Sequence, residues 1–450
     1  MEGLTSMFGT LPTAVQTALT VLKQAGIQAV LVGGCVRDAL MGVPPHDYDI
    51  AAGAPPAVLK DVFSAFPLIL DGEKHGTVTP VIDHTPVEIT SFRTESGYQD
   101  GRHPDKVSFS ATLEDDLMRR DFTVNAMAWS PDGGLTDLFG GQEDLQSGVI
   151  RCVGDPAGRF SEDALRILRG LRFSSRLGFS IEEKTARAMH AQAESLKKIS
   201  RERICAELTG ALTGAHALNT LSAFPDVLFA VIPELFPLYH CPQKSVYHIY
   251  DVWEHTLHVL DEVTPRTPLL CWSALLHDCA KPMTRHRDRK GFDHYPGHQQ
   301  EGARLAESVC KSLKMSNQMI RDITTLVLWH DERMTEDQVP LMLYRVGPEL
   351  FDDLIALQKA DMLAHAERIS KDAGKLDALL LRRDQAIKNG ECIGYSTLAV
   401  TGDDLKALGW QGKELGQSLE WALMQVLKGK LPNDRDTLLR EIGKPENQQT

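Results

Sequence analysis

The stretch from Val30 to Ile50, VLVGGCVRDALMGVPPHDYDI, decides the fold that the start of this chain is expected to adopt. An apolar, β-branched run over residues 28 to 32 ends in Gly33 and Gly34, and a short run with helical character comes next. After two prolines the chain extends again. This order of signals predicts a strand, a tight turn, a helix and a second strand.

Two carboxylates lie at the start of the second predicted strand. Because side chains alternate along a strand, Asp47 and Asp49 should project from the same face. Two unpaired carboxylates on one face repel each other unless a cation lies between them, and Mg²⁺ takes such oxygen ligands together with phosphate oxygens. The Gly33-Gly34 turn lets backbone N–H groups approach an anion at the start of a helix. The stretch therefore predicts a site where phosphate and metal meet.

Length and composition are those of an ordinary globular protein. The 450 residues are enough for about three domains, each with its own core. Hydrophobic residues make up 42% and charged residues 24% of the chain, which is the usual balance of a soluble fold. The net charge of −13 argues against a protein that binds nucleic acid over its whole surface, although a local basic face can still do so.

The eight cysteines form no Cys-x-x-Cys pair and no zinc-ligand spacing, so we expect reduced thiols in a cytoplasmic protein. The first residues lack a cationic and apolar leader, and no run approaches the ~18 apolar residues of a membrane-spanning helix. We therefore expect neither secretion nor membrane insertion. The oligomeric state stays open.

The Gly-Gly-x-Val-Arg-Asp string followed by Asp-x-Asp resembles the signature of the polymerase-beta-like nucleotidyltransferases, specifically the class II family of bacterial tRNA nucleotidyltransferases and poly(A) polymerases. An isolated Asp-x-Asp pair would more simply be a solvated turn. The resemblance implies an α+β fold. It consists of a polymerase-beta-like catalytic head with a mixed sheet (1–150), a helical neck that recognises the nucleotide (151–240), an HD domain (241–370) and a helical tRNA-binding tail (371–450).

Further elements of the head follow from local patterns. Apolar positions spaced by three and four predict an amphipathic helix over residues 11 to 26, and another helix is expected over 55 to 65. β-rich runs at 77 to 82 and 87 to 92 predict a hairpin-like pair of strands. Glu88 lies on the second run. By itself it would be a solvated strand residue, but the resemblance implies that it is the third carboxylate of the site.

Residues 93 to 112 are polar and rich in turn formers, which is typical of a working loop or of a disordered connector. Tyr98, Asp100, Arg102 and Pro104 match the Tyr-x-Asp-x-Arg-x-Pro pattern of the family's flexible loop. The resemblance implies that this loop is needed for the final A addition. Its presence favours the full CCA reaction over addition of C alone.

A second motif, LMRRDFTVNA at residues 117 to 126, resembles the family's Arg-Arg-Asp-Phe-Thr-x-Asn-Ala motif. The resemblance implies that Arg120 reaches the triphosphate of the nucleotide. A guanidinium suits this role because it is planar, permanently charged and able to bind phosphate oxygens through two N–H groups. The alternative is a surface ion-pair cluster.

Residues 159 to 203 form a basic segment within an acidic protein, with eleven Lys or Arg against six Asp or Glu, so RNA could bind there. The run from 159 to 173 has a helical period, with apolar residues on one face and arginines on the other. Asp163 lies one turn before Arg166 and is expected to hold it in place. An acceptor and a fixed donor of this kind can read the edge of a base. The alternative is an amphipathic helix with solvated salt bridges.

The same run matches the family's Glu-Asp-x-x-Arg base-recognition motif, and the arginines after it match the family's triphosphate-side arginines. The resemblance therefore implies a nucleotide-binding set that consists of Gly33, Gly34, Arg37, Arg120, Asp163, Arg166, Arg169 and Arg172. Residues 199 to 207 resemble the next motif, a neck helix with a supporting role.

A different pattern begins near residue 248. His255, the adjacent His277-Asp278 pair and Asp361 follow one another in the order of the HD phosphohydrolase superfamily, which this region resembles. Neutral imidazoles with carboxylates suit a transition metal such as Mn²⁺, Ni²⁺ or iron, which could activate water on a phosphoester.

Other histidines lie near this pattern. His298 and His330 match positions that complete a second metal site in some members of the superfamily. Single histidines on helices are otherwise packed or solvated, and no role is assigned to His248, His258 or His365.

The matches cover nearly the whole chain. They imply an enzyme that adds C, C and A to the 3′ end of tRNA without a template, from CTP and ATP. Asp47 and Asp49 would hold Mg²⁺ for in-line attack of the tRNA 3′-hydroxyl on the α-phosphorus, with release of pyrophosphate. The HD domain could add a phosphohydrolase activity.

Other functions remain open at this stage. The chain could be a poly(A) polymerase or an enzyme that adds only A. It could instead be an HD phosphohydrolase whose amino-terminal half senses nucleotides. A tRNA-binding scaffold without turnover would leave the paired acids unexplained.

Overall fold

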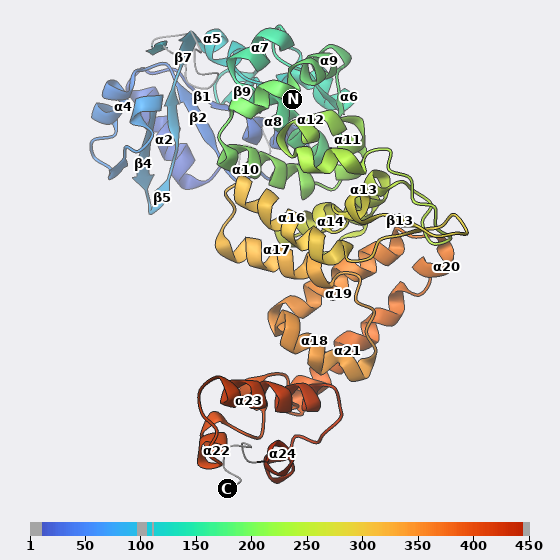
Figure 1. Ribbon diagram of the computed structural model, residues 1–450. Helices are drawn as coiled ribbons and strands as arrows, with labels where there is room; N and C mark the ends of the chain where they lie inside the picture. The colour runs from blue at the N-terminus through green and yellow to red at the C-terminus, as the bar shows by residue number, and fades with distance from the viewer. Residues whose placement is uncertain (1–10, 97–105, 110–111, 444–450) are drawn as a thin grey trace. The chain divides into compact units, whose positions relative to one another are not determined.

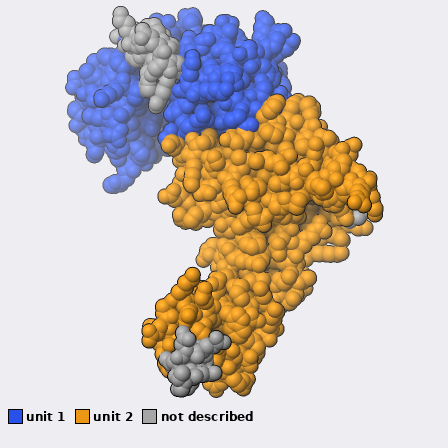
Figure 2. Space-filling model, viewed as in Figure 1, with its two compact units in different colours: residues 1–233 blue, residues 234–450 orange. Residues whose placement is uncertain are grey.

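The chain divides into two compact units, Met1–Pro233 and Glu234–Thr450, which Figure 2 shows in different colours. The structure is a computed structural model and describes residues 11–96, 106–109 and 112–443. Unit 1 contains a mixed sheet with helices, and unit 2 is built mainly of helices, so the predicted α+β class is confirmed (Figure 1). The division lies near the boundary predicted at 240, and the four-domain scheme itself stays a prediction.

The sheet of unit 1 has the strand order β10-β9-β1-β2-β6-β4-β3, and β5 also pairs with β4. β2 and β6 run parallel, whereas β1 pairs antiparallel with both β2 and β9. The strands span Ala29–Val32 (β1), Asp49–Ala52 (β2), Leu68–Ile69 (β3), Thr77–Ile82 (β4), Thr85–Pro86 (β5), Ile89–Ser91 (β6), Met127–Ser130 (β9) and Gly134–Asp137 (β10).

β1 is a central strand because its side chains are apolar on both faces. Leu31 packs into the main core of the unit, whereas Val30 and Val32 pack into a second cluster. This alternation is what a strand buried on both sides requires. Helix α2, Thr13–Gln24, buries its apolar side chains in the same core as Leu31. The predicted strand, turn, helix and strand are all present, with α3 at Gly34–Leu40 as the helix.

Other elements predicted in the head are present with small changes at their ends. Helix α4 spans Pro56–Val62, β4 covers the predicted run, and β6 is shorter than its run and pairs antiparallel with β4. Strands β7, Arg93–Ser96, and β8, Lys106–Phe109, pair with each other. The loop motif with Tyr98, Asp100, Arg102 and Pro104 lies outside the described residues.

After β8, unit 1 is mainly helical apart from strands β9 and β10 of the sheet. The helices of this part are α5 (Leu113–Met118), α6 (Gly141–Ser147), α7 (Pro156–Glu162), α8 (Leu165–Leu177), α9 (Glu183–Gln192), α10 (Arg201–Leu212), α11 (Ala217–Ala223) and α12 (Pro225–Val231). The prediction of one continuous helix from 159 to 173 is wrong, because the chain is extended at Asp163. There the carboxylate accepts a hydrogen bond from the backbone N–H of Leu165 at 3.0 Å, a local bond that competes with the helix.

Unit 2 is organised around α14, Pro268–Leu276, whose side chains from Leu270 onward are all buried. Around α14 lie α13 (Val252–Glu262), α17 (Asn317–Trp329) and α19 (Pro348–Leu363). The other helices include α15 (Lys281–Thr284), α16 (His298–Ser312), α18 (Val339–Val346), α20 (Glu367–Ser370), α21 (Asp377–Lys388), α22 (Gly402–Ala407), α23 (Gly412–Leu427) and α24 (Arg435–Ile442). Within the ranges that the structure describes, no helix is both long and apolar enough to cross a bilayer.

Candidate active site

A cavity of about 1000 Å³ lies in unit 1 where the carboxyl end of β1, α3 and α8 meet. Most of the predicted site residues line it, although they come from distant parts of the chain. These residues are Gly33, Gly34, Arg37, Asp47, Asp49, Arg120, Asp163, Arg166, Arg169 and Arg172. The sequence motifs of the head and of the basic segment therefore converge on one site.

The turn between β1 and α3 forms one wall of the cavity. Gly33 has a φ of +76°, a left-handed conformation that favours glycine. A Cβ at this position would lie 3.0 Å from Nη1 of Arg120 and 3.9 Å from Oδ2 of Asp49. Glycine is therefore needed here both for the turn and for the close approach of a guanidinium and a carboxylate.

The paired carboxylates lie at the start of β2, with Asp47 just before the strand and Asp49 as its first residue. Desolvation in the cavity raises the pKa of the Asp49 carboxyl, Arg120 opposes this, and the charge of Asp47 adds to it. The raised pKa means that the protein alone poorly compensates the charge of the desolvated Asp49 carboxylate. A divalent cation between Asp47 and Asp49 would supply the missing charge, so the donor set fits a hard metal ion.

Glu88 lies next to these carboxylates in the sheet but not in the cavity wall. Ile50 pairs with Ile89 in the parallel register, so Glu88 and Asp49 each precede a paired residue on neighbouring strands. The backbone carbonyl of Glu88 accepts a hydrogen bond from the N–H of Ile50 at 3.1 Å, and its side chain is exposed. Glu88 is not among the lining residues, and its role as the third carboxylate stays a prediction.

Arg120 follows α5 and is held in place by Asp116, whose side chain is completely buried. Nη2 of Arg120 donates to Asp116 Oδ2 at 3.2 Å, and Nη2 of Arg119 donates to Oδ1 of the same carboxylate at 2.6 Å. Nε of Arg120 is buried and has no hydrogen-bond partner. This is a buried ion-pair network on a cavity wall, which does not fit the alternative of a surface cluster.

Three arginines surround the ring of Phe173, a buried residue that the sequence did not identify as part of the site. The guanidinium carbons of Arg37, Arg169 and Arg172 lie 5.4, 5.4 and 4.5 Å from the ring centroid. An aromatic face attracts cations, so the ring favours the gathering of these guanidiniums, which otherwise repel one another. The sequence feature that could have identified Phe173 is its position on α8, directly after Arg172.

Each of these arginines is also paired with an acid or an amide. Arg169 Nε donates to Asp121 at 2.7 Å, Arg172 Nε donates to Glu207 at 2.6 Å, and Arg37 Nη1 donates to Asn125 at 2.7 Å. Such pairing fixes the guanidiniums before any ligand arrives. The cavity can therefore bind a polyanion without much reorganisation of its walls.

The predicted contact between Asp163 and the Arg166 side chain is wrong. Nη1 of Arg166 donates to Glu162 at 2.6 Å, and Asp163 instead accepts a hydrogen bond from Nη2 of Arg203 at 2.9 Å. The prediction failed because it assumed a continuous helix, whereas the break at Asp163 turns its carboxylate toward α10. Arg203 lines the cavity and has a buried Nη1 without a hydrogen-bond partner.

A second cluster of polar side chains lies in unit 2 beside a cavity of about 660 Å³. His255 comes from α13, His277 and Asp278 follow α14, and Asp361 lies in α19. Nε2 of His255 lies 2.9 Å from Oδ1 of Asp361, and Nε2 of His277 lies 3.1 Å from Oδ2 of Asp278. The structure thus brings together all four residues of the predicted HD pattern.

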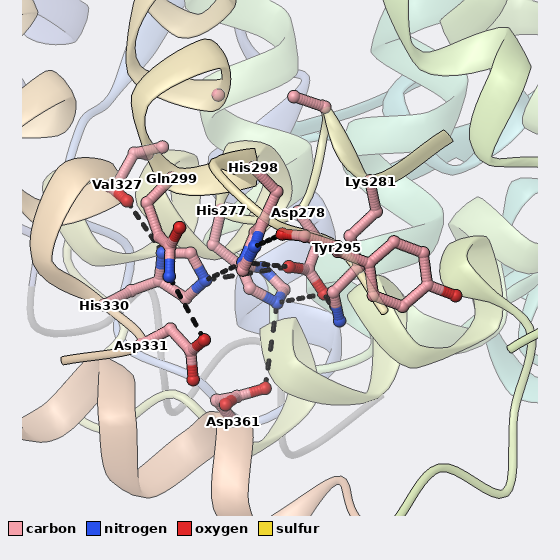
Figure 3. Close-up of polar contacts among 12 residues, drawn as sticks. His277, Asp278, Lys281, Tyr295, His298, Gln299, Val327, His330, Asp331 and Asp361 are labelled. Atoms are coloured by element: carbon pink, nitrogen blue, oxygen red, sulfur yellow. Dashed lines mark hydrogen bonds and ion pairs between the residues drawn. The ribbon is translucent and has the colours of Figure 1, made fainter. Parts of the chain in front are cut away.

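The two further predicted histidines approach the other oxygen of Asp278. Nε2 of His298 and Nε2 of His330 each lie 3.6 Å from Asp278 Oδ1 and 3.4 Å from each other. Figure 3 shows His277, His298 and His330 gathered around Asp278. Nδ1 of His298 and Nδ1 of His330 each lie within 2.8 Å of a backbone carbonyl oxygen, so both rings donate there and present Nε2 to the cluster.

This geometry fits metal ligation. Adjacent ligand atoms of an ion with ~2.1 Å metal–ligand bonds lie about 3 Å apart, close to the separations observed here. Nε2 of His277 and Oδ1 of Asp278 are buried without a hydrogen-bond partner. Buried polar atoms in this state are costly unless something else binds them. Histidines lie near each of the two oxygens of the Asp278 carboxylate. This arrangement would suit a pair of metal ions that share Asp278.

Lys281, His248 and His365 also border this cluster, and the sequence assigned a role to none of them. Nζ of Lys281 lies 2.6 Å from Oδ2 of Asp278. The sequence feature that could have identified Lys281 is its position three residues after Asp278, which places both side chains on one face of a helical turn.

Three family profiles match this chain. They are the poly A polymerase head domain over residues 29–151, an RNA- and SrmB-binding site of polymerase A over residues 178–235, and the second domain of tRNA nucleotidyltransferases over residues 300–442.

Curated relatives match over almost the full chain. A CCA-adding enzyme of Enterococcus faecalis is 34% identical over 96% of both chains. A CCA-adding enzyme of Limosilactobacillus fermentum is 35% identical over 96% of this chain and 98% of the relative.

Solved structures agree with this result. The CCA-adding enzyme of Bacillus stearothermophilus in complex with CTP matches with a TM-score of 0.73 and 27% identity, over 96% of this chain and 97% of the other. The Thermotoga maritima CCA-adding enzyme complexed with tRNA shares the fold, with a TM-score of 0.62 and 22% identity over 98% of both chains.

Proposed function

Because this chain belongs to the family of bacterial CCA-adding enzymes, we propose that the cavity of unit 1 is the place where C, C and A are joined to the 3′ end of tRNA. The protein is a tRNA nucleotidyltransferase whose partners are tRNA, CTP and ATP. The observation that carries the assignment of the site is the convergence of the paired acids and the arginines on one cavity.

Family membership implies use of a divalent metal ion, and we propose Mg²⁺ held by Asp47 and Asp49. The raised pKa of Asp49, which reflects desolvation and the charge of Asp47, supports a cation at this place. Bound Mg²⁺ would lower the pKa of the tRNA 3′-hydroxyl and neutralise charge on the triphosphate. Glu88, next to these acids on the neighbouring strand, would assist either binding of the metal ion or activation of the 3′-hydroxyl.

The arginines of the cavity would bind the triphosphate. Arg120, Arg169 and Arg172 present permanently charged donors, and Arg37 lies in α3, the helix that begins at Gly34. These guanidiniums would also stabilise the negative charge of the pyrophosphate as it leaves. The pairs with Asp121 and Glu207 hold the guanidiniums of Arg169 and Arg172 in place before the nucleotide binds.

Choice of base requires a donor and an acceptor at fixed positions. Cytosine and adenine both present an amino group beside a ring nitrogen that accepts, whereas uracil and guanine present the reverse order. The Asp163 carboxylate would accept from the amino group. A guanidinium, that of Arg166 or of Arg203, would donate to the ring nitrogen, so protein replaces the template.

The test is extension of a tRNA that lacks its terminal CCA, with Mg²⁺ and CTP alone, ATP alone, or both. Two added residues with CTP and a third only with both nucleotides are expected. A ladder of A would indicate a poly(A) polymerase, and a single A added only to tRNA ending in CC would indicate an A-adding enzyme. The Asp47→Ala and Asp49→Ala variants should lose transfer but retain tRNA in a gel-shift assay, and surviving transfer would contradict the metal assignment.

We also propose that unit 2 is a metal-dependent phosphohydrolase. Support comes from the gathering of the other five predicted ligands near Asp278, and from Nε2 of His277 and Oδ1 of Asp278, which have no hydrogen-bond partner. A bound transition metal such as Mn²⁺ or Ni²⁺ would activate water toward a phosphoester.

The test is metal titration of the full chain carrying Asp47→Ala and Asp49→Ala, followed by hydrolysis of p-nitrophenyl phosphate and bis(p-nitrophenyl) phosphate. Asp278→Ala should abolish metal uptake and hydrolysis together. Hydrolysis that survives this change would contradict the proposal.

A cytoplasmic location is part of this proposal. All eight cysteines are free thiols, and seven of them are buried. Free thiols in this number suit a reducing compartment.

A further inference from the structure

Among the arginines that line the cavity of unit 1, Arg176 has no role in the nucleotide site proposed above. It lies in the last turn of α8, and its side chain is exposed. Because residues three and four apart share one face of a helix, Arg176 continues the row formed by Arg169 and Arg172. At 1.5 Å of rise per residue it lies about 6 Å further along α8 than Arg172.

Arg176 differs from other arginines of the cavity in its partners. The guanidiniums of Arg169 and Arg172 each donate to a carboxylate inside unit 1, at 2.7 and 2.6 Å. Arg203 likewise donates to Asp163 at 2.9 Å. Within the residues that the structure describes, by contrast, Arg176 donates to no acid, amide or carbonyl group. All five of its N–H groups are therefore available to a ligand.

The unmatched charge of Arg176 suits an anion, and the proposed reaction brings two kinds of anion into this cavity. The triphosphate is already matched by Mg²⁺ and by the arginines assigned to it. The tRNA strand carries phosphodiester groups in with its 3′-hydroxyl, and no side chain described so far binds them. A guanidinium suits such a group because it is permanently charged and can donate two N–H groups to phosphate oxygens.

Two apolar side chains on the border of the same cavity favour the strand over the triphosphate. Met41 directly follows α3 and is 39% exposed, and Val43 is 47% exposed. An unstacked nucleotide at the end of an RNA strand presents the face of a base as well as a phosphate, whereas a triphosphate group presents only charge. The cavity border therefore offers both kinds of contact that the end of a strand needs.

We propose that Arg176 binds a backbone phosphate near the 3′ end of the tRNA and thereby positions the attacking hydroxyl. The inference rests on the proposed function of unit 1 and adds a residue that contacts the RNA strand rather than the incoming nucleotide. A contact to a phosphodiester does not depend on the base. Arg176 therefore serves each addition in turn, on tRNA without CCA, on tRNA ending in C and on tRNA ending in CC.

The test compares Arg176→Gln with the parent in single-nucleotide extension of tRNA that lacks CCA, with tRNA and CTP varied separately. The variant should raise KM for tRNA about fivefold, near the upper end for one exposed ion pair, and leave KM for CTP within about twofold. The slope of log affinity for tRNA against log salt concentration should become less steep by about 0.7, the value for one phosphate contact on a single strand. Arg176→Lys keeps the charge and should recover most of the affinity.

A modified substrate tests the contact itself. Each of the linkages nearest the 3′ end of the tRNA is replaced in turn by an uncharged methylphosphonate. At the linkage that Arg176 binds, the replacement should raise KM for tRNA about fivefold in the parent and have little further effect in Arg176→Gln, because the two changes remove the same interaction. The control is Lys23→Gln, which removes a positive charge outside the cavity, where Lys23 pairs with Asp132 at 2.8 Å, and it should behave as the parent does.

Three results would overturn the role of Arg176. An unchanged KM for tRNA in Arg176→Gln would show that it binds no phosphate of the strand. A raised KM for CTP with an unchanged KM for tRNA would assign it to the triphosphate. Methylphosphonate effects that are equal in the parent and in Arg176→Gln at every linkage would show that it acts on tRNA elsewhere. A parent that adds no nucleotide would overturn the proposed function itself, whereas failure of the inference alone leaves the activity of the parent in place.

Discussion

The pair between Arg203 and Asp163 provides the sharpest test of how this enzyme selects a base. In Arg203→Met the hydrogen bond from Nη2 to Asp163 Oδ2, 2.9 Å long, is lost, whereas the bond from the Leu165 N–H at 3.0 Å remains. A hydrogen bond between charged groups contributes about 1.5 to 3 kcal/mol. The side chains of this pair are 28% and 18% exposed, so the lower end of that range applies.

A loss of about 1.5 kcal/mol in the free energy that orients the Asp163 carboxylate corresponds to a factor of about ten. Arg203→Met should therefore lower the ratio of kcat/KM for CTP over UTP about tenfold. The assay is single-nucleotide extension of tRNA that lacks CCA, with each nucleotide varied separately. The ratio for ATP over GTP on tRNA ending in CC should fall by a similar factor.

The control is Arg201→Met on the same helix, because Arg201 donates to the backbone carbonyl of Val231 instead of facing the cavity. It should leave both ratios unchanged. If Arg203→Met lowers the rates with all four nucleotides equally, or leaves the ratios as they were, Arg203 does not position Asp163 and the reasoning is refuted.

Three further outcomes are expected. Gly141→Ala should destabilise unit 1 by about 2 kcal/mol in urea unfolding, because the added Cβ would lie 2.4 Å from the carbonyl oxygen of Thr123. The control, Gly416→Ala on an exposed face of α23, should be neutral or slightly stabilising. Burial opposes ionisation of Asp121, but Arg169 outweighs it and holds the pKa of that carboxyl below its usual value. The stability that this pair adds is present above the unfolded-state pKa near ~3.9 and is lost as the pH falls, so Asp121→Asn should flatten the acid side of the stability profile of unit 1. In the chain carrying Asp47→Ala and Asp49→Ala, removal of Mn²⁺ by a chelator should lower the unfolding temperature of unit 2 and leave that of unit 1 in place, and equal shifts would contradict the assignment of the Mn²⁺ site to unit 2.

The strand, turn, helix and strand at the start of the chain were predictable because each depends on local chemistry. A β-branched run, a pair of glycines and the alternation of side chains act over a few residues, and β1, α3 and β4 follow them closely. The sequence also singled out the six histidines and acids that the structure gathers in the buried cluster of unit 2, because their order resembles that of the HD phosphohydrolase superfamily.

Other features of the site could not be predicted from local patterns. The assumption of a regular helix paired Asp163 with Arg166, but a side chain that bonds the backbone at Leu165 interrupts the helix and turns the carboxylate toward Arg203. From the sequence, Phe173 is an ordinary core residue. Only the structure shows that three arginines from two helices lie around its ring.

The sequence by itself determined the chemical inventory of this protein: the acids, arginines and histidines, their order, and the local elements that carry them. Only the tertiary structure decided which partner each charged side chain takes. The reason is physical, because hydrogen bonds and ion pairs act over a few ångströms. Arg203 reaches Asp163 across 40 residues of chain, and Lys281 meets His248 across 33, and neither separation has a period that a sequence pattern could reveal.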